Sequence, residues 1–407
     1  MAFSGMSGAV GMAVESVFCS VPLSGSAAPY VAGIPSTNPM RFCAIEPGNG
    51  ISGEPLLDLK PEIDGMVEQK RITLVGKQYK GELSVRADSE NLYYPMLGIL
   101  GRDIQALVQA QDASHSPAMF RHVMTPGKSV PSFTVEEQTG DGTNGRLTSG
   151  AVIEEVTLDF GEIVTAVMSI VAHRQIPNSY PDSSGVSRSI QFGALPAILP
   201  VQMGGDGVKT VIQNPLPSFV DVQGGSSGNG PLVFAAMGVG TQIVGGFLSV
   251  NGVVVPVQLL PGTRVVLKRA IDSRQIAGSG YDPGAILCAE FTVTGRLVCL
   301  YQDMNLPAAL MNFSQCAINL KVTGGLVGTS GTAATLEVWL PHVKLQRAPV
   351  PHAAGAIVIN ADFVAMYDAI AGHSVQVTLV NSLDASQLGG GAGTATGTGG
   401  PGGWLAN

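Results

Sequence analysis

The residues best suited to chemistry are a group of carboxylates near the middle of the chain. They are Glu154, Glu155, Asp159 and Glu162. Paired carboxylates with different pKa values are what a general acid and a general base require. These carboxylates, however, surround the apolar residues Val156, Leu158 and Phe160, which recur with a period of two. Because that period is typical of a half-buried β-strand, the pattern favours carboxylates on the polar face of a sheet over a catalytic pair.

Other motifs for cofactors, metals or nucleophiles are incomplete. Residues 238–243 lack the third glycine of a dinucleotide fingerprint, and residues 141–145 lack the further carboxylates of a calcium loop. No histidine stands at metal-binding spacing from Cys, Asp or Glu. The 5 cysteines are dispersed, which favours free thiols in a reducing compartment. We therefore expect no catalytic residues, no metal, no cofactor and no enzymatic activity.

The elements around these residues are predicted to be strands. Apolar and polar residues alternate at 83–87, 156–160, 291–299, 318–322, 336–340 and 375–379. Asn251-Gly252 between two apolar runs predicts a hairpin with a tight turn. A polar opening at 88–91, followed by apolar residues to 100, predicts a short helix. The fold class is therefore mainly β.

Composition divides the chain into five segments. Residues 1–70 are punctuated by proline and predict an extended N-terminal arm or a mobile tail. Residues 71–175 and 246–382 carry the β patterns. Between them, residues 176–245 form a Gly/Ser/Pro-rich insertion with hardly any charge, and residues 383–407 form a Gly-rich tail.

A motif recurs in the two β segments at the same spacing. Its members in the first segment are Gly81, Leu83, Asn91 and Leu92, and those in the second are Gly295, Leu297, Asn305 and Leu306. Each block is predicted to be a strand that runs into a short helix. We interpret the match as a duplicated domain, and the alternative is chance similarity between short β motifs.

The charge of the chain restricts its partners. Charged residues make up 13% of the sequence, against about 25% in an average globular chain, and the net charge is −8. Without a basic excess, the chain is not expected to read a DNA or RNA sequence. No run of about 20 apolar residues occurs, so no membrane span is expected. The shortage of charge favours a surface that is largely covered by partners.

The order of these motifs resembles the tail tube proteins of long-tailed, non-contractile (siphovirus-type) bacteriophages, in their duplicated-domain form. The stretches that carry the resemblance are 81–100, 133–136, 150–162, 247–253, 336–345 and 362–381. They span residues 70–175 and 245–382, and the insertion and the Gly-rich tail have no place in the pattern. The resemblance implies two tandem tail-tube-type β-sandwich or barrel domains, each with a short helix.

The same resemblance implies a function. Such proteins form rings that stack into a tube, and double-stranded DNA passes through its channel into the host without sequence-specific binding. A duplicated domain implies trimers with pseudo-sixfold rings, other tail proteins at the tube ends, a place in the virion, and assembly in the host bacterial cytoplasm. The four carboxylates are then expected to include residues that face the channel, where acidic walls repel phosphates. The alternatives are a contact between rings or the outer surface.

Two other functions compete with a tube subunit. A coat or decoration protein of the virion would form closed shells or bind capsids instead of stacking. A carbohydrate-binding or hydrolytic β-sandwich would require clustered aromatic residues or a close pair of carboxylates. Aromatic residues make up only 6% of the chain, with Trp339 and Trp404 as its two tryptophans, so the second alternative has little support.

Overall fold

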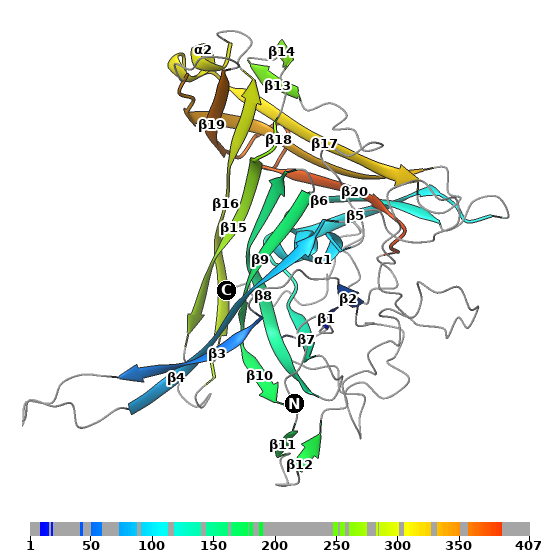
Figure 1. The fold of residues 1–407 in the computed structure, drawn as a ribbon, viewed down its shortest axis with the longest axis vertical. Coiled ribbons are helices and arrows are strands. Elements are labelled where there is room, and N and C mark those ends of the chain that lie inside the picture. Colours follow the sequence, from blue (N-terminus) through cyan, green and yellow to red (C-terminus); the bar gives the residue numbers. More distant parts are fainter. Residues whose placement is uncertain are drawn as a thin grey trace, which may run out of the picture.

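The protein is mainly β, as the sequence predicts (Figure 1). The computed structural model describes residues 9–15, 18, 41–43, 50–58, 73–87, 91–112, 118–139, 144–161, 164–177, 179–181, 187–189, 247–250, 253–256, 260–274, 282–283, 285–300, 305–326, 332–350 and 357–384. Most of the insertion at 176–245 and nearly all of the Gly-rich tail lie outside these residues.

Strands and one helix alternate through the first half of the chain. They are β1 (Ala9–Val14), β2 (Arg41–Cys43), β3 (Ser52–Asp58), β4 (Thr73–Arg86), α1 (Tyr93–Leu100), β5 (Gly101–Gln109), β6 (Met119–Pro126), β7 (Phe133–Thr139), β8 (Asn144–Phe160), β9 (Val164–Ala172) and β10 (Arg174–Pro177). A small separate hairpin follows, formed by β11 (Ser179–Pro181) and β12 (Ser187–Ser189).

The second half contains a similar series. Its elements are β13 (Phe247–Val250), β14 (Val253–Pro256), β15 (Thr263–Arg274), β16 (Ala285–Leu300), α2 (Asn305–Met311), β17 (Cys316–Leu326), β18 (Ala333–Arg347), β19 (Val358–Ala365) and β20 (Gln376–Asn381). β13 and β14 pair with Val250 opposite Val253, which confirms the predicted hairpin around Asn251-Gly252.

Antiparallel strands of both halves join into one sheet. Its central part runs β3, β4, β9, β8, β15, β16, β19 and β18, and each strand pairs with the next. β8 is long enough to serve two partners on each side. Its first part lies between β7 and β10, and its last part lies between β9 and β15. β8 therefore ties the two halves together through its pairing with β15.

The pairings of the first half recur in the second half in the same chain order. β1 pairs with β2 and β7, as β13 pairs with β14 and β17. β3 pairs with β4 and β4 with β9, as β15 pairs with β16 and β16 with β19. β8 pairs with β7, β9 and β10, as β18 pairs with β17, β19 and β20. The β5–β6 hairpin has no counterpart among the described residues of the second half.

The repeated motif occupies corresponding places in the two halves. Gly81 lies in β4 and Gly295 in β16, and Leu83 and Leu297 two residues later are buried in the core. A Cβ at Gly81 would collide with the backbone of Ile51, and one at Gly295 would collide with the Arg264 carbonyl and the Phe363 ring. Both sites require glycine because a neighbouring segment crosses too closely for a side chain.

The remaining members of the motif lie where each strand leads into a helix. Asn91 and Leu92 are buried just before α1, and Asn305 and Leu306 open α2. The predicted sequence of strand followed by short helix is therefore present in both halves.

The first helix is enclosed on all sides. Every residue of α1 is buried, and Gly98 lies so close to Ile153 and Phe133 that no side chain would fit there. α1 packs against β8, β6, β5 and β15, so strands from both halves cover it (Figure 1). The core is accordingly continuous between the halves.

The region that the sequence predicted as an extended arm contributes strands to the first half. β1 lies along β7 and buries Val10, Met12 and Val14. Glu15 follows β1 and is buried, and its carboxylate accepts hydrogen bonds from Ser132, Thr134 and the Gly150 N–H. These contacts fasten the N-terminal strand, because each donor would otherwise be buried without an acceptor.

Candidate functional site

One face of the central sheet is polar across both halves. The opposite face carries the buried residues, such as Leu158 on β8 and Leu267 on β15. On the polar face the side chains form rows that cross the strands, because directly opposed residues of antiparallel strands point to the same side. Thr157, Val266 and Thr294 form one such row on β8, β15 and β16. This polar face is the surface on which the predicted carboxylates lie.

Two ion pairs join neighbouring strands on this face, and Arg264 of β15 stands opposite Arg296 of β16 as a pair of like charges. Glu155 on β8 stands opposite Lys268 on β15, with 3.1 Å between Oε2 and Nζ. Asp362 on β19 stands opposite Arg296 on β16, with 2.7 Å between Oδ1 and Nε. The hydrogen bond and the charge of Glu155 raise the pKa of Lys268 above its usual value. The face therefore carries two cross-strand ion pairs among other polar side chains.

The four predicted carboxylates have different environments. Glu155 is held in the ion pair with Lys268, and Asp159 stands opposite Arg264 in the register of β8 and β15. Glu154 lies at a β-bulge, where the pairing of β8 with β9 shifts between Ile153 and Glu155. Glu162 lies outside the described residues. Each of the two carboxylates in the paired part of the strand thus faces a cationic residue from the second half.

A buried arginine joins β15 to α1. Arg269 occupies a core position of β15 and donates hydrogen bonds to the Ile99 and Gly127 carbonyls, and its guanidinium lies over the Phe291 ring at 5.2 Å. Ile99 is near the C-terminal end of α1, where helical carbonyls lack partners within the helix and favour a positive charge. Desolvation lowers the pKa of Arg269. A side chain of the second half thus supplies hydrogen-bond donors to the C-terminal end of the helix in the first half.

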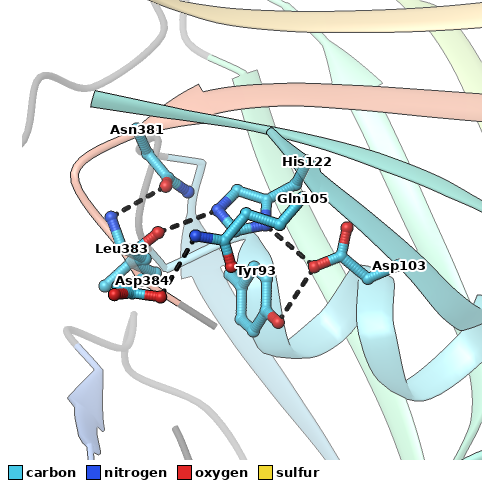
Figure 2. Close-up of polar contacts among 7 residues, drawn as sticks. All are labelled: Tyr93, Asp103, Gln105, His122, Asn381, Leu383 and Asp384. Carbon is cyan, nitrogen blue, oxygen red and sulfur yellow. Dashed lines mark hydrogen bonds and ion pairs between the residues drawn. The ribbon is translucent and has the colours of Figure 1, made fainter. Parts of the chain in front are cut away.

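A second buried polar network ties β5 and β6 to the end of β20, and Figure 2 shows its members. The His122 ring contacts the Asp103 carboxylate through Nδ1 at 2.8 Å and the Leu383 carbonyl through Nε2 at 3.0 Å. Tyr93 donates to the same Asp103 oxygen at 3.2 Å. The His122 ring thus bridges the Asp103 side chain on β5 and the backbone that follows β20.

This network has no access to a substrate. Asp103 and His122 are both fully buried, and the Tyr93 pKa is raised mainly by burial. At its edge, Gln105 donates to Asp384 and the Leu383 N–H donates to Asn381 (Figure 2). It lies beside the pairing of β20 with β6, which is the second strand contact between the two halves. The geometry therefore assigns it to holding the halves together.

The sequence reasoning did not identify these joining residues. Arg269 follows Val265 and Leu267 at the next position of an alternating strand, so a charge at a core position was a signal for it. His122 and Asp103 gave no such signal, because their partners are distant in sequence and His122 meets a backbone carbonyl that any residue could supply.

The sheet has two open ends. β3 pairs with β4 along one edge, and among the described strands none pairs with its other edge. β18 pairs with β17 as far as Val343. Beyond Val343, no described strand pairs with the edge of β18 that faced β17. Near the first open end, Leu56, Leu57 and Val75 are exposed at 38%, 45% and 52%. Exposed apolar residues along an unpaired strand edge mark a surface suited to association.

Features of other site types are sparse in the described part of the chain. No cluster of three His, Cys, Asp or Glu residues is placed there to bind a metal. Cys288, Cys299 and Cys316 are free thiols, and burial raises the Cys299 pKa to about 11, which makes its thiol unreactive. The described helices are all too short or too polar to cross a membrane.

The fold and these surfaces define a β-rich structural protein with two similar halves and unpaired sheet edges. A family model described as phage tail tube protein matches residues 5–365. The chain therefore belongs to the phage tail tube protein family and is a structural protein of the phage tail. The match confirms the resemblance noted from the sequence, and it also spans the N-terminal region that the resemblance left out. No curated protein matches the chain.

Proposed function

We propose that this chain is a duplicated tube subunit, three copies of which close a ring with six similar units. The observation that carries the proposal is the pairing of β15 with β8, since it joins the sheets of two units with the same strand order. A joint between units that already exists inside one chain supplies a template for joints between chains. Closure of a sheet into a barrel also removes edges, which are otherwise sites of uncontrolled association.

The two units have boundaries that differ from the segments read from composition. We place the first unit from β1 to β10 and the second from β13 to β20, because these series share their pairings. β1, β2 and β3, the described strands of the segment at 1–70, then belong to the first unit as the counterparts of β13, β14 and β15. The β5–β6 hairpin of the first unit extends the sheet beside β20 of the second.

The polar face of the central sheet is proposed to line the channel through which double-stranded DNA passes into the host. The ion pairs Lys268–Glu155 and Arg296–Asp362 support this, because each carboxylate neutralises a cation that phosphates would otherwise bind. Thr294 adds an exposed hydroxyl to the same face. DNA is then neither held nor strongly repelled, which differs from the acidic wall expected from the sequence.

The purified protein tests this proposal by electron microscopy. A tube subunit assembles into rings or stacked tubes with an open channel. Closed shells, or binding to capsids without stacking, would support a coat or decoration protein instead. Only small monodisperse monomers under conditions that permit assembly would contradict both. In the phage, the subunit is proposed to assemble in the host cytoplasm and to meet other tail proteins at the tube ends.

A further inference from the structure

The joint between the two halves contains an ion pair whose counterparts lie at the open ends of the sheet. Within the chain, β15 lies along the last part of β8, and Lys268 of β15 stands opposite Glu155 of β8. The two side chains form an ion pair at 3.1 Å. By the repeated pairings, β3 corresponds to β15 and β18 corresponds to β8. The residues of β3 and β18 that match Lys268 and Glu155 can therefore be identified from the register.

The counterpart of Glu155 is Arg347. On β8 the register against β9 shifts between Ile153 and Glu155, and on β18 the register against β19 shifts between Leu345 and Arg347. Ile153 pairs with Ile170, which lies opposite Gly81, and Leu345 pairs with Phe363, which lies opposite Gly295. Ile153 and Leu345 are therefore equivalent. Both strands thus carry a bulge at the same place. The residue after the bulge is negative in β8 (Glu155) and positive in β18 (Arg347).

The counterpart of Lys268 is Glu54. Lys268 pairs with Thr292 on β16, and Glu54 pairs with Gln78 on β4. Thr292 and Gln78 are equivalent because each lies three residues before the repeated glycine of its strand. The position that is a lysine within the chain is therefore a glutamate at the open end. The pair Lys268–Glu155 becomes Glu54–Arg347 with its charges exchanged.

Both counterparts are available for contact. Glu54 and Arg347 are exposed, and neither forms an ion pair with another described residue. The β3–β4 hairpin and β18 lie at opposite ends of the molecule, so they cannot meet within one chain (Figure 1).

We propose that the open edge of β3 in one copy lies antiparallel along the end of β18 in a second copy, with Glu54 opposite Arg347. This contact rests on the proposed function, since it supplies the joint that closes the ring. The pairing of β15 with β8 ends at Lys268 and Glu155, so the equivalent joint pairs residues 51–54 with residues 347–350, and Leu56 and Leu57 lie just beyond its end. The exchanged charges also prevent the wrong pairing, because β3 against β8 would place Glu54 opposite Glu155.

A charge-exchange cycle tests the pair. Glu54→Arg and Arg347→Glu each place like charges opposite each other and should raise the concentration needed for half-maximal assembly by about tenfold or more. The double variant restores opposite charges and should recover most of the loss. Circular dichroism of each variant should match that of the wild type, because both side chains are exposed. Additive losses in the double variant would overturn the pairing.

A cross-link tests the same contact without relying on charge. The Glu54→Cys, Arg347→Cys double variant should form covalent trimers under mild oxidation of assembled protein, while each single variant should not. Cross-linking only within monomers, or none in assembled tubes, would overturn the inference while leaving the tube function intact. If the wild-type protein forms no rings or tubes, the proposed function itself fails and the inference falls with it.

Discussion

Single residues decide how closely the segments of this protein approach each other. Gly81 and Gly295 stand at equivalent places in the two halves, and each is crossed by a neighbouring segment that leaves no room for a Cβ. Arg269, His122 and Glu15 have the opposite role, because each fills a buried space with hydrogen bonds to backbone or side-chain groups. Residues of both kinds therefore set how the segments of the subunit are joined.

Gly295→Ala is expected to destabilise the subunit by about 1–3 kcal/mol, because the new methyl group collides with the Arg264 carbonyl and the Phe363 ring. Urea unfolding of unassembled protein measures the change. Gly127→Ala is the control, since its Cβ would lie 3.2 Å from the nearest atom, the Ser129 carbonyl oxygen, and needs only a small shift. If Gly295→Ala were as stable as the wild type, the close approach of the Arg264 carbonyl and the Phe363 ring to Gly295 would be contradicted.

His122→Ala should cost about 3 kcal/mol of unfolding free energy, because it removes the ring that contacts the Leu383 carbonyl and the buried Asp103 carboxylate, which then keeps the Tyr93 hydroxyl as a donor. Tyr93→Phe removes one donor from Asp103 and keeps His122, so its expected cost is smaller, about 1 kcal/mol. Hydrogen exchange should localise the effect of His122→Ala to β6 and β20. A larger loss from Tyr93→Phe would contradict the central place of His122.

Glu137 gives a pH dependence of known sign. Burial raises the pKa of its carboxyl above the ordinary value of 4.5. The folded chain then retains a proton that the unfolded chain releases, so stability falls as pH rises from about 4.5 through the folded pKa. Glu137→Gln keeps an acceptor for the Ile51 N–H and should flatten this dependence. Unfolding at several pH values checks it, and an unchanged slope would refute the assignment.

Elements, unlike single residues, could largely be predicted from the sequence. Alternation identified strands such as β8, β16 and β18, and Asn251-Gly252 identified the hairpin of β13 and β14. The strand β1 was not predicted, because its pattern Ala-Val-Gly-Met-Ala-Val does not alternate and both of its faces are covered. The pairing partners could not be predicted either, since long-range register depends on bulges and turns that composition does not reveal.

The contact of β15 with α1 depends on Arg269. Arg269→Met keeps the aliphatic volume but removes the hydrogen bonds to the partly buried Gly127 carbonyl and to the Ile99 carbonyl, which then remains buried without this donor. The expected loss of unfolding free energy is about 2 kcal/mol. Arg264→Met on the polar face of the same strand is the matched control, with a change below about 0.5 kcal/mol. Similar losses of unfolding free energy in both variants would show that Arg269 does not hold β15 against α1.

The N-terminal strand is predicted to be part of the first unit. Glu15→Ala removes the acceptor of Ser132, Thr134 and the Gly150 N–H, and should destabilise the subunit by about 2–3 kcal/mol. Limited proteolysis should then cut the N-terminal region faster than in the wild type. Wild-type stability and unchanged proteolysis in Glu15→Ala would instead support a separate arm.

The described strands form two similar units joined through one sheet, and among them β3 and the end of β18 each have an edge without a partner strand. The low charge of the chain fits the proposed assembly, in which neighbouring copies cover further surface. The joint of β15 with β8 inside the chain and the proposed joint of β3 with β18 between chains use equivalent positions. A ring built in this way has alternating joints of two kinds.

Electron cryo-microscopy of the assembled tube tests this account most directly. The account predicts rings of three chains with six similar units, in which β3 of each chain lies along the end of β18 of its neighbour and the polar face lines the channel. Rings of six chains, or a channel lined by another surface, would contradict it.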